Sequence, residues 1–375
     1  MSGATMTHAR VRSSRPAEAG ITLVELMVAV TLSSLAVAMI FAVYSRSSSA
    51  YHTQSGIAEL QQTLRAASSQ LVKDVRNSGY LAQEVATSLG ELKAVTVHNN
   101  DGSEGADWFV LTWADTGTSA QVKPVNPPFN AAVSTIVACN PDPFCGFADG
   151  DVVMAIRTNP AAADFGEACV LAITALVPGG PKLQHNPGQG APWNQPGNTQ
   201  CDDLQAGWAD GFTLFVSYSA VAYRIHPTDP RGMLEMSPSG GLIANDWRPL
   251  ALGIVDLQLA LRVWNGAGTN LDGDGDVNRD WLSGENMEAV DPGDVLQVRL
   301  SLVARNHGDV DWITTVATPE LCDPARVANN DLGDHCSFDP TAVAATSRYY
   351  GNHIYRHTTE TIDVRNLRIG TGTTP

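Results

Sequence analysis

A run of apolar residues from Ile21 to Tyr44 dominates the start of the chain. At about 1.5 Å of rise per residue, a helix of this length crosses a bilayer core of roughly 30 Å. Glu25 is the only ionisable side chain in the run before Tyr44. Because a carboxylate is costly to bury in hydrocarbon, we expect Glu25 to have a partner and a function. The pattern predicts a membrane-spanning helix over 21–44.

From Ile57 onward the apolar residues recur at steps of three and four. The members of this repeat are Ile57, Leu60, Leu64, Ala67, Leu71 and Val75. Such spacing predicts an amphipathic helix over 45–80 that lays its apolar side on a β-sheet. Gly79 is suited to the position that follows a helix end.

Beyond Tyr80 the pattern changes to short apolar, β-prone runs bounded by Asp, Gly or Asn. Strands are predicted at 92–97, 108–113, 152–156, 170–177, 212–225, 249–263, 295–305 and 358–367. Residues 178–200, rich in Gly, Pro, Asn and Gln, are predicted to form an exposed loop. One long helix followed by these strands predicts an α+β fold on a mainly antiparallel sheet, with a β-rich domain over 81–375 and a candidate sub-boundary near 226–233.

Residues 1–20 read as a leader, with arginines at positions 10, 12 and 15. By the positive-inside rule these charges keep the N-terminus cytoplasmic and send the remainder outward. The apolar run is longer than a secretory signal core of about 7–15 residues, and no small-x-small cleavage site follows it. Small residues stand before the run instead, at Ala19 and Gly20. A cut after Gly20 would leave the whole helix on the mature protein.

Gly20 followed by Ile21-Thr22-Leu23-Val24-Glu25 resembles the class III signal of type IV pilins and pseudopilins. The resemblance implies cleavage between Gly20 and Ile21 by a prepilin peptidase and N-methylation of Ile21. It also implies that Glu25 of one subunit pairs with the new α-amine of a neighbour in a bundle of helices. An unpaired buried charge costs several kcal/mol, so this pair would select correctly inserted subunits.

Later motifs resemble those of PilW-type minor pilins in their order along the chain. They lie at 71–80, 254–257, 272–276, 298–305 and 361–367. The resemblance implies a minor pilin that joins other minor pilins and the major pilin to prime type IV pilus assembly near the tip, with a tip adhesin as a further candidate partner. The protein would wait in the bacterial inner membrane and then reach the pilus and cell surface.

Two alternatives remain open at this point. One is a J-type pseudopilin of a type II secretion system, although such proteins are usually shorter than 375 residues. The other is an adhesive binding module carried on a pilin anchor.

Composition narrows the classes of function. The chain carries 39 acidic and 23 basic residues, for a net charge of −16, and the basic residues form no stripe. This charge argues against general binding to nucleic acid or to anionic membranes. The sequence contains no G-x-S-x-G, H-E-x-x-H or P-loop motif, so neither an enzyme nor a required cofactor is predicted.

All six cysteines lie beyond the membrane helix, in what should be an oxidising compartment. An even number there predicts three disulfides. We favour pairing of nearest neighbours, because each bond closes a loop rich in Pro, Gly, Asp or Asn: Cys139–Cys145, Cys169–Cys201 and Cys322–Cys336. Zinc binding is the rival interpretation, with His335 beside Cys336, but the paired C-x-x-C spacing of zinc sites is missing.

An acidic loop places oxygen-bearing side chains at alternate positions: Asp272, Asp274, Asp276, Asn278 and Asp280. Ca²⁺ takes roughly six to eight oxygen ligands, so this loop is a candidate calcium site. Its spacing imitates an EF-hand loop, but Val277 stands where the invariant glycine should be and Ser283 where the bidentate glutamate should be. The alternative is a solvated acidic turn, since Asp-Gly pairs favour turns.

We predict that calorimetric titration of the protein with Ca²⁺ gives a binding heat that Asp274→Ala abolishes, because this change removes a central ligand of the loop. Asp101→Ala, outside the loop, should leave the heat unchanged. A chain that gives no heat with Ca²⁺ would identify the loop as an acidic turn.

Overall fold

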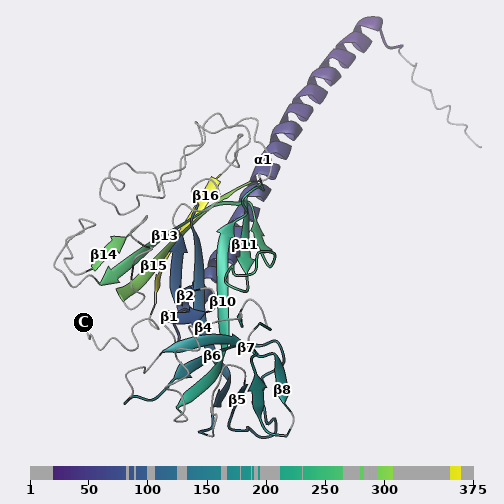
Figure 1. Ribbon diagram of the computed structural model, residues 1–375. Coiled ribbons are helices and arrows are strands. Elements are labelled where there is room, and N and C mark those ends of the chain that lie inside the picture. Colours follow the sequence, from purple (N-terminus) through teal and green to yellow (C-terminus); the bar gives the residue numbers. More distant parts are fainter. Residues whose placement is uncertain are drawn as a thin grey trace, which may run out of the picture. The chain divides into compact units, whose positions relative to one another are not determined.

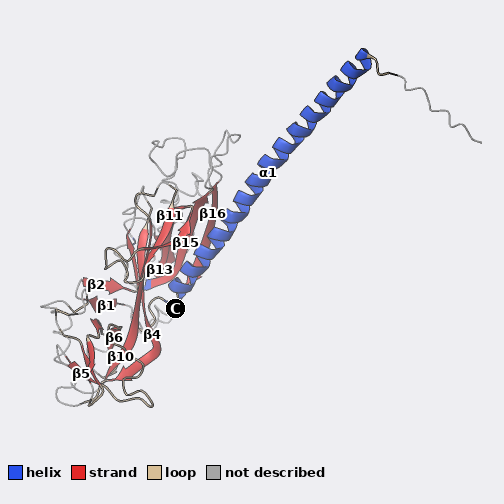
Figure 2. Ribbon diagram, turned by 90° about the vertical axis from the view of Figure 1, so that its right-hand side faces the viewer, coloured by secondary structure: helices blue, strands red, loops and turns tan. Residues whose placement is uncertain are grey.

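The computed structural model describes residues 20–81, 84–87, 90–98, 106–124, 133–161, 167–177, 179–186, 188–189, 193–194, 212–229, 231–264, 279–282, 287, 290, 294–306 and 355–364. The chain divides into two compact units, one up to Ser55 and one from Gly56 onward. One long helix precedes a series of mainly antiparallel strands, so the predicted α+β class is confirmed (Figure 2).

Helix α1 (Leu23–Asn77) runs unbroken for 55 residues. The apolar run and the amphipathic repeat therefore belong to one continuous helix. Its end is marked by a hydrogen bond from the Ser78 N–H to the Asp74 carbonyl (3.0 Å) and by Gly79, whose φ is 74°. A positive φ costs glycine little, because it has no Cβ to clash, so Gly79 ends the helix as the sequence predicts.

The second unit contains three sheets within the described residues (Figure 1). The large sheet has nine strands: β1 (Glu84–Thr87), β2 (Gly90–Lys93), β3 (Val95–His98), β4 (Trp108–Gln121), β6 (Val152–Arg157), β7 (Ala168–Ala172), β10 (Thr213–Ile225), β11 (Met233–Ser237) and β12 (Arg248–Leu252). The second sheet has four: β13 (Ile254–Trp264), β14 (Arg279–Leu282), β15 (Val295–Arg305) and β16 (Tyr355–Asp363). The small sheet has three: β5 (Val133–Thr135), β8 (Ala175–Val177) and β9 (Lys182–Gln184).

Strand β10 organises the large sheet. It pairs antiparallel with β4 over most of its length, with β6 near its start and with β11 near its end. β10 and β11 are neighbours in the chain and pair antiparallel, with Ile225 aligned with Leu234. Among the described strand pairs only β1 and β7 run parallel, through Ala86 and Cys169. The pairing explains why β10 needs thirteen residues, since three different neighbours share it.

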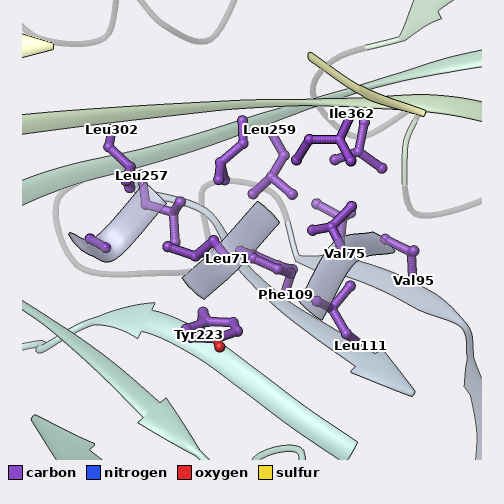
Figure 3. Packing of buried hydrophobic residues seen from close by; sticks show 14 of the residues in the cluster. Leu71, Val75, Val95, Phe109, Leu111, Tyr223, Leu257, Leu259, Leu302 and Ile362 are labelled. Atoms are coloured by element: carbon purple, nitrogen blue, oxygen red, sulfur yellow. The ribbon is translucent and has the colours of Figure 1, made fainter. Parts of the chain in front are cut away.

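The second half of α1 lies between the large sheet and the second sheet. Its buried stripe is the predicted one and consists of Leu60, Leu64, Ala67, Leu71 and Val75. Ile57 is partly buried. In Figure 3, Leu71 and Val75 lie between Leu257 and Leu259 on one side and Phe109 and Tyr223 on the other. The sequence predicted contact with one sheet, whereas the helix fills the space between two.

Two predicted strands are each divided in the structure. Residues 170–177 form β7 and β8, which belong to different sheets. Residues 249–263 form β12 and β13, which are separated by Gly253 with a φ of 83°. The Gly253 N–H donates to the Gly232 carbonyl at 2.7 Å, and its own carbonyl accepts from the Arg305 N–H at 2.8 Å. This glycine therefore carries the chain from the large sheet to the second sheet.

The prediction of an exposed loop over 178–200 is wrong for part of its described residues, although Gly179, Gly188 and Gln189 are exposed. The described residues include β9, and Leu183, Trp193 and Asn194 are buried. The Asn194 side chain accepts a hydrogen bond from the Ala172 N–H (2.9 Å) and donates to the Ala172 carbonyl (2.6 Å). A side-chain amide thus takes the place of a neighbouring strand beside β7, which a composition rich in Gly, Pro and Asn does not reveal.

Cys139 and Cys145 form a disulfide with a Cα–Cα distance of 5.0 Å, which agrees with the nearest-neighbour pairing. Asp142 shapes the loop between them by accepting hydrogen bonds from the N–H groups of Phe144 (3.0 Å) and Gly146 (2.6 Å). Cys169 is also disulfide-bonded. Cys201, Cys322 and Cys336 lie outside the described residues, so the other two pairings stay predictions.

One buried polar contact fixes α1 against the large sheet. The Tyr223 hydroxyl of β10 donates to the Asp74 carboxylate of α1, which also accepts from Gln70 Nε2 at 2.9 Å. Burial, and then the bond to Asp74, raise the pKa of Tyr223 above its ordinary value. The folded state therefore favours the neutral phenol, so this contribution to stability is complete below the ordinary tyrosine pKa of about 10 and is lost as the pH rises.

We predict that Tyr223→Phe lowers the free energy of unfolding by about 1–3 kcal/mol at neutral pH, because Asp74 loses a buried donor. The loss of stability above about pH 10 should also be shallower than in the parent chain. Urea unfolding followed by tryptophan fluorescence at several pH values would measure both. Tyr80→Phe is the control, since Tyr80 is 37% exposed. Equal alkaline slopes in the parent and Tyr223→Phe would contradict the assignment.

Candidate functional site

The segment that carries the predicted processing and assembly residues lies at the start of α1. The Glu25 carboxylate oxygen Oε2 accepts hydrogen bonds from the Thr22 N–H (3.0 Å) and the Thr22 hydroxyl (2.9 Å). In return, the Glu25 N–H donates to Thr22 Oγ1 at 3.3 Å. These reciprocal bonds form a capping box, which satisfies N–H groups that a helix start otherwise leaves unpaired.

The capping box leaves Glu25 with capacity for a further partner. Both bonds from Thr22 end on Oε2, and within the described residues Oε1 accepts none. An ionised carboxylate has about four lone-pair sites, so a cationic donor could bind while the cap stays intact. The sequence analysis missed this contact, although its signal, a threonine three residues before a glutamate, was present in 22–25.

Gly20 is not required by the packing of the chain itself. It is exposed, and a Cβ built on it meets no heavy atom within 4 Å. Its φ also lies outside the left-handed region that favours glycine. Within the described residues, neither space nor backbone conformation therefore explains a glycine here.

The apolar part of α1 presents its large side chains to the surroundings, and all of them from Ile21 to Tyr44 are exposed. Two of the hydroxyl side chains among them are bonded within the helix. The Thr31 hydroxyl donates to the Met27 carbonyl at 3.0 Å, and the Ser34 hydroxyl to the Val30 carbonyl at 2.7 Å. Since hydrocarbon offers no partners, such internal bonds suit a helix in a bilayer. By length and composition, α1 qualifies as a membrane span.

A family model for the prokaryotic N-terminal methylation motif matches residues 15–41. The chain has a pilin-type N-terminus. The motif is a prepilin signal, which implies processing by a prepilin peptidase, and it agrees with anchoring in a membrane and display on a pilus. The matched stretch includes Gly20, Ile21 and Glu25. Neither the curated proteins nor the solved structures gave a match to the chain.

Most of the candidate calcium loop lies outside the described residues. This holds for Asp272, Asp274, Asp276 and Asn278, whereas Asp280 lies in β14 opposite Val263 of β13. Elsewhere in the described part of the chain, no group of three or more His, Cys, Asp or Glu residues could hold a metal ion. Calcium binding by the loop therefore stays a prediction.

Three charged residues of the later motifs are buried in the second unit, whereas Lys73, Arg76 and Asp363 are exposed. Asp74 is 5% exposed, Asp256 is 3% exposed and Arg305 is 7% exposed. The Asp256 carboxylate accepts from the Leu257 N–H (2.9 Å) and from Gln258 Nε2 (3.0 Å). Buried charges need such partners, so these residues serve the fold and do not form a surface site.

We predict that Thr22→Val accelerates amide hydrogen exchange at the first turn of α1 by several-fold. The change removes both side-chain bonds of Thr22, and loss of a helix cap costs about 0.5–2 kcal/mol. Mass spectrometry of the protein in lipid nanodiscs would measure the exchange. Thr22→Ser keeps the hydroxyl and should exchange like the parent. Equal exchange in the two variants would show that the cap contributes nothing.

Proposed function

We propose that the protein is a minor pilin of the PilW type, which primes type IV pilus assembly in a complex with other minor pilins near the pilus tip. The observation that carries the proposal is the methylation motif, in which Glu25 is the fifth residue after the expected cut at Gly20. The order of the later motifs along the chain favours the PilW type. The protein acts by assembly, and it has no catalytic role.

The proposed mechanism begins with cleavage between Gly20 and Ile21, which creates an α-amine at the end of the apolar helix. Glu25 of a neighbouring subunit binds this amine through Oε1, the oxygen that the capping box leaves open within the described residues. Both groups are charged and lie in a low-dielectric bundle, where an unpaired charge costs several kcal/mol. A subunit at the wrong depth leaves two charges unpaired, so the pair selects the correct register.

The buried charges of the second unit support the proposal in a second way. Asp74 lies within the motif at 71–80, and Asp256 within the motif at 254–257. Asp74 accepts from Tyr223 of β10 and so joins α1 to the large sheet, whereas the donors to Asp256 are its neighbours Leu257 and Gln258 in β13. The motif at 71–80 thus includes a residue that fixes the helix against the sheet, and this favours a PilW-type subunit over an unrelated module carried on a pilin anchor.

We predict that Glu25→Ala and Glu25→Gln each reduce surface piliation at least about tenfold, because neither side chain can neutralise the amine of a neighbour. The glutamine variant is the sharper test. Glutamine at this position preserves a capping box, so it removes the charge and keeps the cap. Quantitative immunoblots of sheared pili would measure piliation.

The same blots on whole cells should show that both variants lose the leader, which separates assembly from processing. Thr22→Ser is the matched control and should be piliated normally. Full piliation in cells that carry Glu25→Gln would mean that Glu25 serves its own helix alone, and the pairing mechanism would be wrong.

A further inference from the structure

The face of the large sheet that turns away from α1 carries a row of aromatic and charged side chains. Tyr223 of β10 and Phe109 of β4 pair with each other and lie in the core around α1. Because side chains alternate along a strand, the next residues in this register, Arg224 and Trp108, lie on the opposite face. Glu235 of β11 pairs with Arg224. The register thus places a tryptophan, an arginine and a glutamate side by side on three neighbouring strands.

Two contacts fix the guanidinium of Arg224. Its Nε donates to Glu235 Oε2 at 2.9 Å, and its Cζ lies 3.9 Å from the centre of the Trp247 ring. The Glu235 side chain is buried, whereas 31% of the Arg224 side chain is exposed. Within the described residues Nε is the one bonded nitrogen of this guanidinium, so Nη1 and Nη2 keep their donors for a ligand. Since the plane of the guanidinium is already fixed, little conformational freedom is lost when these two nitrogens bind.

Arg231, between β10 and β11, provides a comparison. It is 63% exposed, but its Nε and Nη2 both donate to the Asp229 carboxylate, at 3.1 and 2.9 Å. This arginine therefore already holds a carboxylate in the two-bond arrangement that suits a guanidinium. Arg224 has the same capacity at Nη1 and Nη2 and does not use it within the described residues.

Two indole rings lie beside Arg224. A Cβ built on Gly241 would lie 3.5 Å from Trp247 and 3.6 Å from Trp108, so the two rings approach the same point. Gly241 has a φ of 81° and places no side chain there. His98 stacks on Trp108, with 3.7 Å between the ring centres and 5° between the planes, and this contact orients the second indole. Both tryptophans are partly exposed, so aromatic surface accompanies the exposed guanidinium.

These groups fit a carboxylate that is carried on a sugar ring. A planar carboxylate accepts two parallel hydrogen bonds from a guanidinium, and the apolar C–H face of a sugar ring packs on an indole as other apolar surfaces do. The chain has a net charge of −16, and Glu235 lies beside Arg224. A singly charged carboxylate is therefore repelled less than a doubly charged phosphate. A short peptide carboxylate would bind the arginine but leave the indoles uncovered.

We propose that Arg224, Trp108 and Trp247 form a binding site for a hexuronic acid residue of an acidic polysaccharide. The carboxylate of the sugar binds Nη1 and Nη2 of Arg224, and its ring packs against the indoles. One ion pair and one ring contact bury little surface, so the dissociation constant for a single residue is on the order of 1 mM. The site belongs to the second unit alone and does not depend on the proposed role in pilus assembly.

Saturation-transfer NMR on the full chain in lipid nanodiscs, with empty nanodiscs as the blank, tests the site. Sodium glucuronate should bind at least about tenfold more tightly than glucose, which has the ring without the carboxylate. It should also bind at least about tenfold more tightly than N-acetylglycine, which has a peptide carboxylate without the sugar ring. Both comparisons use the parent chain, so they decide the question even where a variant fails to fold.

Arg224→Lys provides the second arm. Lysine keeps a positive charge beside Glu235 but has no guanidinium fork, so the affinity for glucuronate should fall at least about tenfold while that for glucose stays the same. Arg231→Lys is the matched control and should bind glucuronate like the parent, because the fork of Arg231 is already used by Asp229. Trp247→Leu removes an indole and should weaken the binding of both sugars.

Four results would overturn the proposal. They are no saturation transfer to glucuronate from the parent chain, equal affinity for glucuronate and glucose, N-acetylglycine binding as tightly as glucuronate, and unchanged affinity in Arg224→Lys. The third result would assign the arginine to a peptide carboxylate. Protease resistance of each variant separates a lost contact from a lost fold.

Discussion

The burial of one helical stripe between two sheets is the constraint on which the second unit depends. Leu60, Leu64 and Leu71 are each 5% exposed or less, and they share a core with strands of both the large sheet and the second sheet. Each sheet has an apolar face that must be covered, and the helix covers both. The strands that precede and follow Gly253 belong to different sheets. Without the helix these two sheets could not pack, because the helix fills the space that their side chains line.

Polar contacts then decide how the helix and the sheets are aligned. Asp74 receives the Tyr223 hydroxyl of the large sheet, and Asp107 receives the Leu259 N–H of the second sheet at 2.8 Å. A hydrophobic stripe alone tolerates a slip of one helical turn, about 5.4 Å, with little change in apolar contact. Such a slip would leave the buried Asp74 carboxylate without its Tyr223 donor, at a cost of about 1–3 kcal/mol. Asp74 therefore specifies one alignment of a helix that could otherwise slide, and the bond of Asp107 aligns the two sheets with each other.

Features with a local pattern were predictable from the sequence, and features that depend on distant partners were not. The stripe on α1 and the boundaries of β15 follow from spacing within a few residues. The position of α1 between two sheets, and the burial of Asn194 beside Ala172, depend on segments far apart in the chain. Gly253 divides a continuous apolar run because of bonds to Gly232 and Arg305, which no local pattern contains. The capping box of Thr22 and Glu25 is a local feature that could have been predicted. The three-residue spacing was visible in the sequence, but it was not interpreted as a helix cap.

Some residues of the N-terminal segment are not explained by the packing of the chain. The hydroxyls of Thr31 and Ser34 are satisfied within their own helix, which suits these two side chains to a bilayer. Gly20 has free space around it where any small residue would fit, and Glu25 places a carboxylate in a stretch where an apolar side chain would be less costly. Packing within the described residues thus accounts for neither the glycine at 20 nor the carboxylate at 25, and both lie in the stretch that the methylation-motif model matches.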